Sequence, residues 1–273
     1  MEDDIHRSIL KAVQDLLAHS TSQDKIQAIA GKHAVKTHFI PVKYRILGGL
    51  LQSMNIQFGN FLEKVIANIV ALDPDNEIMT EYSGKSFRKF RYASRSFELI
   101  DQYLDAIQAH PRLEQDGIQQ GYEQLLSSII ETEDTVREED KRIVAHDIDL
   151  LFRRGGRFLV YAEIKYNDDH DTGKFVDINR KLLKTYVLLI NEFRIRNTSN
   201  IKPVLLYFND KLKKINPYLP EHDVIYRGPR FFDEFTSTAY SAIESAFARI
   251  SESREICHEF DLLTEKILGK RMM

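Results

Sequence analysis

A hairpin pattern around Gly155-Gly156 constrains the fold of this chain more than any other feature of its sequence. Two largely apolar runs, residues 143–153 and 157–165, flank the glycine pair, which is typical of a tight turn between antiparallel strands. Residues 150–152 and 158–162 are apolar at successive positions, so both faces of the hairpin need cover. The pattern predicts a hairpin buried inside a sheet.

The segments that follow the hairpin predict the rest of the sheet. Residues 175–195 have apolar side chains at helical spacing, and residues 202–210, "KPVLLYFND", form a short apolar run typical of a buried strand. The order strand, strand, helix, strand predicts a crossover helix on one face of a mixed sheet. We therefore expect an α/β (α+β) fold, a central mixed β-sheet flanked by helices.

The first half of the chain is predicted to be mainly helical. Helical periodicity covers residues 3–18, 56–70, 96–109 and 116–131, and Pro74 ends the second of these. Two more helices are expected near 233–250 and 254–269. Because no linker rich in Pro, Gly or Ser divides the chain, we expect a single domain over 1–273, with a mainly helical region at 1–135 and an α/β core at 136–273.

Composition excludes several classes of protein. A single cysteine among 273 residues excludes an internal disulfide framework and a zinc site built on cysteine spacing. The acidic start and the shortness of the apolar runs argue against a secretory signal and a membrane span, so we expect a cytoplasmic protein. The net charge of −3 argues against nonspecific coating of nucleic acid, although residues 84–97 contain five basic residues and no acid.

The ends of the hairpin carry charged residues that can form one site if they lie on the same face. Glu163 and Lys165 lie on one face of the second strand because side chains alternate. A two-residue turn would pair Glu163 with Ile148, whereas an odd-length loop or a bulge would bring it to Asp149 or Asp147. An odd register is therefore a requirement for a site here; without it, the charges are the polar ends of an ordinary hairpin.

An acid pair with a nearby lysine suits metal-dependent hydrolysis of a phosphodiester. Two close carboxylates repel each other, and a hard divalent cation such as Mg²⁺ relieves that repulsion. A metal-bound water is a better nucleophile, and a lysine adds positive charge beside the scissile phosphate. The order Asp, Glu, Lys thus predicts a magnesium-dependent phosphodiesterase.

The stretch "DIDLLFRRGGRFLVYAEIK" resembles the PD-(D/E)XK nuclease superfamily, with His146 in place of the usual proline. The resemblance implies that Asp149 and Glu163 hold the metal, that Asp147 is the alternative first ligand, and that Lys165 is the catalytic lysine. It also implies a glutamate on a preceding helix, for which Glu63 is the candidate. Together with the hairpin, "HFIPVKYRILGGLLQSMNIQFGNFLEK" is similar to TdeIII-like restriction endonucleases, which implies a GGNCC-like site.

Basic residues outside the hairpin are candidates for DNA contact, although each also fits a solvated surface position. They occur in residues 84–97, in the helix after the E-x-K motif and in "YRGPRFF". These candidates are Lys85, Arg88, Lys89, Arg91, Arg95, Lys174, Arg180, Lys181, Arg227 and Arg230. The acidic stretch "NDDHD", residues 167–171, is interpreted as a solvated turn.

The resemblance implies a type II restriction endonuclease that cleaves double-stranded DNA with Mg²⁺, as a homodimer matched to a palindromic site. The nearest alternative is a repair nuclease or Holliday-junction resolvase of the same superfamily. A non-catalytic nucleic-acid-binding module with a nuclease fold is the contrasting class, and the presence of all three site residues argues against it.

Overall fold

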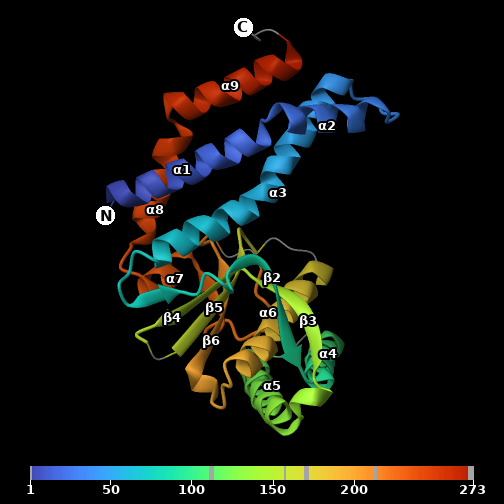
Figure 1. Ribbon diagram of the computed structural model, residues 1–273, viewed down its shortest axis with the longest axis vertical. Coiled ribbons are helices and arrows are strands. Elements are labelled where there is room, and N and C mark those ends of the chain that lie inside the picture. Colours follow the sequence, from blue (N-terminus) through green and yellow to red (C-terminus); the bar gives the residue numbers. More distant parts are fainter. Residues whose placement is uncertain (1, 111–113, 157, 169–171, 212–213, 270–273) are drawn as a thin grey trace. The chain divides into compact units, whose positions relative to one another are not determined.

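The computed structural model of the protein describes residues 2–110, 114–156, 158–168, 172–211 and 214–269. The part of the chain that it describes divides into two compact units. The helical unit comprises Met1–Ile69 and Thr238–Met273, and the sheet unit comprises Val70–Ser237. Elements of both are labelled in Figure 1. Among the described residues, no helix is both long enough and apolar enough to cross a membrane.

The sheet unit is built on a mixed sheet, in which the described residues form five strands in the order β1-β4-β5-β6-β7. The first two pairs along this order are antiparallel and the last two are parallel. The predicted mixed sheet is therefore confirmed. The strands are β1 (Asn76–Ile78), β4 (Leu150–Arg154), β5 (Phe158–Lys165), β6 (Ile201–Tyr207) and β7 (Ile225–Arg227).

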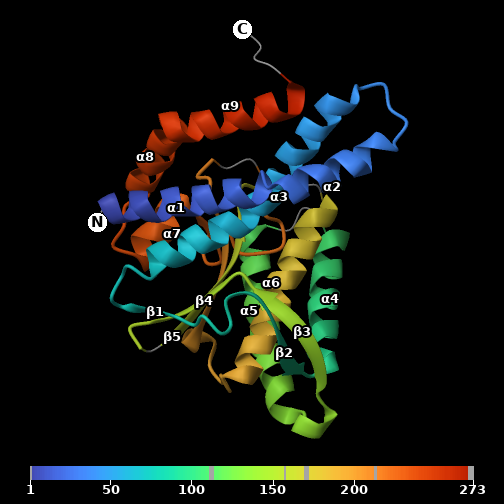
Figure 2. The same cartoon turned by 45° about the horizontal axis from the view of Figure 1, so that its top comes forward.

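The predicted crossover helix is α6 (Thr172–Glu192), which connects the parallel strands β5 and β6. The hydroxyl of the buried Tyr161, on β5, donates a hydrogen bond of 3.0 Å to the carbonyl of Leu182, which fixes the middle of α6 against the sheet. Two further helices, α4 (Ser94–Ala109) and α5 (Gln115–Thr135), pack on α6. Figure 2 shows these three helices side by side.

A separate two-stranded sheet, within the described residues, pairs β2 (Gly84–Tyr92) with β3 (Arg142–Ile148). The sequence did not predict β2, because its side chains are mostly exposed and lack apolar alternation. The predicted single strand 143–153 is also wrong in one respect. Strand β3 of the two-stranded sheet ends at Ile148, and strand β4 of the mixed sheet begins at Leu150. Asp149 is therefore the single residue that connects the two sheets.

The hairpin between β4 and β5 has the odd register that the site requires. Its last pair is Arg154 with Phe158, which leaves an odd number of residues in the turn. Gly155 and Gly156 have φ angles of +55° and +65°, a left-handed conformation that glycine adopts at little cost. Residue 157, predicted to begin the second strand, lies outside the described residues.

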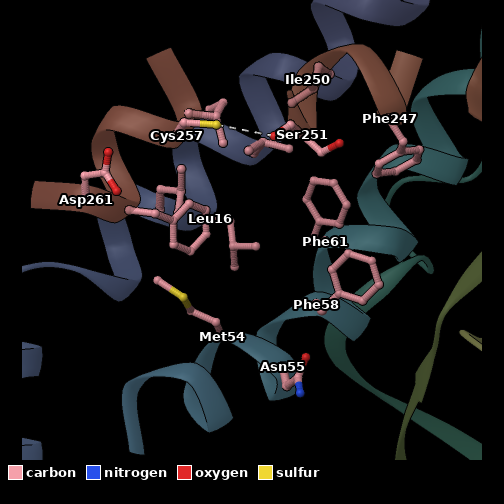
Figure 3. Close-up of a pocket in the computed structure, with 14 residues that line it drawn as sticks. Leu16, Met54, Asn55, Phe58, Phe61, Phe247, Ile250, Ser251, Cys257 and Asp261 are labelled. Atoms are coloured by element: carbon pink, nitrogen blue, oxygen red, sulfur yellow. Dashed lines mark hydrogen bonds between the residues drawn. The ribbon is translucent and has the colours of Figure 1, made fainter. Parts of the chain in front are cut away.

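The helical unit consists, in its described part, of α1 (Glu2–Ser20), α2 (Gln23–Ala34), α3 (Val42–Val70), α8 (Tyr240–Ser251) and α9 (Arg254–Leu268). An apolar pocket of about 490 Å³ lies among α1, α3, α8 and α9 (Figure 3). Its walls include Phe58, Phe61, Met54 and Phe247. The single cysteine, Cys257, is exposed at the rim of this pocket and forms no disulfide.

Several predicted helix boundaries need correction. The helix predicted at 56–70 begins fourteen residues earlier, directly after Pro41. The helix predicted at 233–250 is two helices, α7 (Gly228–Phe235) and α8, because the backbone becomes extended at Thr236. The predicted division at residue 135 does not coincide with the two compact units, since α4 and α5 belong with the sheet.

Candidate active site

Asp149 and Glu163 face each other where the hairpin meets the rest of the sheet. The register pairs Leu150 with Ala162, so the next position along each strand brings Asp149 opposite Glu163. The backbone N–H of Ile164 donates a hydrogen bond of 2.8 Å to Asp149 Oδ2, which fixes that carboxylate beside β5. Asp149 is 8% exposed and Glu163 is 4% exposed. Two acids are thus held together in a nearly buried position.

Two lysines neutralise this acid pair. Lys165 Nζ lies 2.6 Å from Glu163 Oε1 and 3.6 Å from Asp149 Oδ2, so the predicted proximity of Glu163 and Lys165 is confirmed. Lys181 Nζ, from α6, lies 2.7 Å from Asp149 Oδ1 and 2.6 Å from Glu163 Oε2. The sequence had placed Lys181 only among the DNA contacts. The structure puts it between the two carboxylates.

A sequence signal for Lys181 existed. It lies on the line Ile178, Lys181, Thr185, Leu188, which alternates steps of three and four along one face of α6. Ile178, Thr185 and Leu188 are all buried, so a lysine on that line points toward the sheet. Among the basic residues of α6, Lys181 was therefore the better candidate for the site, because it lies inside the apolar stripe.

Burial and the closeness of the two carboxylates determine the electrostatics of this cluster. Burial raises the pKa of Glu163, the Asp149 carboxylate raises it further, and Lys165 and Lys181 oppose both effects. Burial alone would lower the pKa of Lys181, but the carboxylates of Glu163 and Asp149 outweigh burial and raise it. Glu163 therefore depends on the lysines close by to remain ionised.

The donor set fits a hard divalent cation. A single ammonium nitrogen, that of Lys181, contacts one oxygen of each carboxylate, so both acids converge on one point that a cation occupies. Carboxylate oxygens are the ligands that Mg²⁺ prefers. Among the residues that the structure describes, no group of three or more His, Cys, Asp and Glu side chains forms a larger metal cluster. The pair Asp149 and Glu163 is the arrangement that suits an ion.

The other predicted acids lie elsewhere. Asp147 Oδ1 accepts a hydrogen bond of 2.8 Å from the backbone N–H of Phe87, whose φ of +47° makes that turn of β2 unusual. Its carboxylate thus stabilises the β2–β3 sheet, and the structure favours Asp149 over Asp147 as the partner of Glu163. Glu63 is half-buried on α3 in the helical unit, and its catalytic role stays a prediction.

Basic residues of segment 84–97 are partly used by the fold. Arg88 forms an ion pair of 3.0 Å with Glu192 and lies 4.1 Å from the centre of the Tyr82 ring. Arg91 donates to the carbonyl of Glu138, and Arg95 pairs with Glu98. These contacts argue against phosphate binding by Arg88 above all, because its side chain is half-buried. Lys85 and Lys89 are exposed on β2, as is Lys174 on α6.

Two predicted arginines of the later segments, Arg180 and Arg230, also have partners inside the sheet unit. Arg180 pairs with Asp101 and Asp177. Arg230 donates to the carbonyls of Ile225 and His222. These contacts hold α6 and the start of α7 in place, which leaves DNA contact by Arg180 and Arg230 a prediction.

The ion pairs of Arg227 contradict one prediction for the acidic stretch at residues 167–171. This arginine pairs with Glu221 and, at 3.2 Å, with Asp168, which is only 1% exposed. The solvated turn predicted at 167–171 is therefore wrong for Asp168, because its carboxylate is buried against a guanidinium. Residues 169–171 of that stretch lie outside the described residues.

Comparison with known proteins decides the family. The family model described as "Type II restriction endonuclease, HinfI" matches residues 1–251. The type II restriction enzyme HinfI of Haemophilus influenzae is 42% identical over 272 residues, which cover 99% of this chain and 100% of the relative. This chain belongs to the HinfI family of type II restriction endonucleases. No solved structure matches it.

Membership of the HinfI family confirms the predicted class. Its enzymes are restriction endonucleases, that is, DNA-binding hydrolases of phosphodiester bonds, so the chain is a nuclease. The match supports this class over a repair nuclease, a junction resolvase or a non-catalytic module. It names the HinfI family and not the TdeIII-like enzymes, so the GGNCC-like site implied by that resemblance has no support from the comparisons.

Proposed function

We propose that this HinfI-family nuclease cleaves both strands of a short palindromic site in double-stranded DNA with Mg²⁺, at a PD-(D/E)XK centre. The observation that carries the proposal is the convergence of Asp149 and Glu163, both nearly buried, on one cation position beside Lys165. A cytoplasmic homodimer, one subunit per strand, matches the symmetry of such a site.

Asp149 and Glu163 would hold the ion, and the bound ion would supply charge for the phosphate and acidify a water. The backbone N–H of Ile164 orients the Asp149 carboxylate, so the pair is preorganised by the strand itself. With an ion on the two carboxylates, Lys165 and Lys181 would no longer be needed to neutralise them and would be available to other anions. Lys165 is then placed to orient the attacking water and to stabilise charge on the phosphate.

The proposed reaction is hydrolysis at phosphorus. Water attacks the phosphorus atom, the bond to the 3′ oxygen breaks, and that oxygen takes up a proton, which leaves 5′-phosphate and 3′-hydroxyl ends. Lys165 follows Glu163 on the same face of β5, its ammonium lies within 3.6 Å of both acids, and its side chain is 25% exposed, so it can also reach solvent. It is therefore the residue whose loss separates cleavage from binding.

Lys165→Ala is the deciding variant. We expect plasmid cleavage in Mg²⁺ to fall by about 10³-fold or more, with DNA binding retained. The matched control is Lys202→Ala, which removes a half-buried lysine from the adjacent strand β6 and should leave cleavage intact. Undiminished cutting by Lys165→Ala would remove the proposed centre.

A side-by-side digestion gives the recognition site. The same plasmid is cut with this enzyme and with the HinfI relative, and the fragments are sized. Identical fragments would assign the relative's recognition sequence to this chain, whereas fragments that end at GGNCC-like sequences would support the TdeIII-like resemblance. A nonspecific smear would contradict site-specific cleavage.

A further inference from the structure

The turn between α2 and α3 is an exposed surface in the helical unit to which nothing above assigns a role. We define the α2–α3 tip as residues 34–44, each of which is exposed. Phe39 is 92% exposed and Val35 is 85% exposed, while Ile40, Val42 and Tyr44 are exposed as well. Figure 2 shows this turn joining the ends of the two helices. Full exposure of a phenylalanine forgoes about 1.5–3 kcal/mol of burial, so such a residue at a tip points to a binding surface.

The charged residues of the segment that carries the tip have one sign. Residues 25–62 contain Lys and Arg at five positions and no Asp or Glu. The basic groups are also close in space: burial and then the charges of Lys36, Arg45, Lys32 and His38 lower the pKa of His33. A cluster of cations without acids, mixed with exposed apolar side chains, is complementary to a polyanion that also offers apolar faces. DNA has both properties.

The tip is held in shape by its own contacts. Arg45 Nη1 donates a hydrogen bond of 2.9 Å to the carbonyl of Lys36, which closes the turn. His38 Nδ1 accepts one of 3.0 Å from the backbone N–H of Ile40, and the rings of His38 and Phe39 stack at 4.9 Å. Phe39 is thus presented by an ordered turn.

Gly49 lets the two helices approach each other behind the tip. A Cβ atom at this position would lie 2.8 Å from His33 Nε2 and 3.0 Å from Ile29 Cγ2. The absence of a side chain therefore allows close packing of α2 on α3. This packing supports a rigid helical hairpin that carries the tip.

We propose that the α2–α3 tip is a DNA-contact surface, in which Lys36 and Lys43 bind backbone phosphates and Phe39 packs into a groove against the bases. A second copy of the chain is the alternative occupant. A twofold contact places the same patch on itself. Cations would then face cations, with no acid in residues 25–62 to compensate, which disfavours that occupant. The inference uses the family's action on DNA and does not depend on the assignment of Lys165.

Equilibrium binding in EDTA tests the tip without cleavage. A fluorescein-labelled duplex is titrated with the full-length protein between about 50 and 200 mM salt. Lys36→Gln combined with Lys43→Gln should weaken binding about tenfold at low salt and lower the slope of log affinity against log salt by about two. Phe39→Ala should weaken binding about fivefold or more and leave the salt slope unchanged.

Matched controls change the same chemistry elsewhere in the helical unit. Lys11→Gln with Lys266→Gln removes the same charge from exposed positions of α1 and α9, and Ile56→Ala removes an apolar side chain that is 72% exposed on α3. Both should bind DNA like the parent. Melting curves and sedimentation of every variant exclude unfolding. Unchanged DNA affinity in the tip variants, or a loss of affinity that follows dissociation of a dimer, would overturn the proposal.

Discussion

Two buried ionic clusters in the sheet unit differ in what holds their acids. In the first, Glu133 on α5 accepts hydrogen bonds from the backbone N–H of Ala93 and the hydroxyl of Ser96 at 2.8 and 2.6 Å. Lys141 lies 3.6 Å from the other oxygen of Glu133 and also binds Glu138 and Asn191. The side chains of Glu133 and Lys141 are 0% and 2% exposed. This cluster joins α4, α5 and α6, and its donors belong to the scaffold.

The second cluster, Asp149 and Glu163 with Lys165 and Lys181, contains two acids instead of one. Its acids are buried almost as fully as Glu133, but the lysine side chains that neutralise them are 25% and 33% exposed. A lysine that already reaches solvent can move away from its acid when a different cation arrives, whereas Lys141 cannot. Both clusters contain buried acids, so burial of the acid does not distinguish them. The difference is the exposure of the lysine: an exposed lysine can be replaced by a metal ion, whereas a buried one forms a structural contact.

The largest expected difference between the clusters concerns their acids. Glu163→Gln should lower the cleavage rate by about 10³-fold or more and leave the melting temperature unchanged or higher, because it relieves repulsion from Asp149. Glu133→Gln should do the reverse: it weakens a buried ion pair and lowers the free energy of unfolding by about 2–4 kcal/mol, with cleavage by the folded protein intact. Thermal melts and plasmid digestion of both variants check this. Equal loss of stability in the two variants would break the comparison.

Mg²⁺ should stabilise the protein through the second cluster alone. In the absence of DNA, an ion at one hundred times its dissociation constant adds about 2.7 kcal/mol to the free energy of unfolding. Differential scanning fluorimetry should therefore show a higher melting temperature with Mg²⁺ that a chelator reverses. The increase should persist in Glu133→Gln and vanish in Glu163→Gln. Persistence in both would place the ion elsewhere.

Lys181→Met sharpens the comparison further, because it removes the ammonium that bridges the two acids. Without that competing cation, the acids repel each other more strongly, so we expect lower stability in EDTA and about tenfold tighter Mg²⁺ binding. Isothermal titration of Mg²⁺ into the DNA-free protein measures the change. Weaker binding by this variant would mean that Lys181 supports the ion instead of competing with it.

The smallest expected effect is the pH dependence of His146, which joins β3 to α6 beside the second cluster. Burial lowers the pKa of His146 to about 4, and the charge of Lys181 adds to this, while Asp147 and Asp149 oppose it. Its neutral ring bonds to Thr185 at 2.7 Å. Because the folded pKa lies below the unfolded value of about 6.5, the unfolded state takes up the proton first, and stability falls as pH drops from about 6.5 to 4.

Urea unfolding of the parent and of His146→Gln across this pH range isolates that contribution. The variant keeps a hydrogen-bonding side chain but cannot titrate, so its stability should decline less between pH values of about 6.5 and 4. Parallel decline in the two proteins would show that other groups account for the whole effect.

The local elements of the fold could be predicted wherever one face of an element is apolar. The helices α1, α4, α5 and α6 and the buried hairpin follow from periodicity, and their boundaries differ from prediction by a few residues. Strand β2 could not be predicted, because an exposed strand has no apolar pattern and forms only when β3 pairs with it. The early start of α3 was hidden by Gly48 and Gly49, which disfavour a helix locally, although Gly49 allows α2 to pack against α3.

The candidate site divides in the same way. Glu163 and Lys165 share a face by strand alternation alone. An odd register between the two strands of the hairpin was predicted as the condition for bringing an aspartate next to them. It could not choose between Asp147 and Asp149, because that choice depends on where the chain leaves β3 for β4. It likewise could not tell that Arg88 and Arg227 are held by acids from distant segments.

The sequence by itself determined which residue types could form a metal-dependent nuclease site, their spacing, and the order of strand, strand, helix and strand around them. These properties depend on alternation and periodicity, which are local. Only the tertiary structure decided that Asp149 faces Glu163 and that Lys181 lies between them. Both depend on the loop register and on the rotation of α6 against β5, and those are set by packing between segments far apart in the chain.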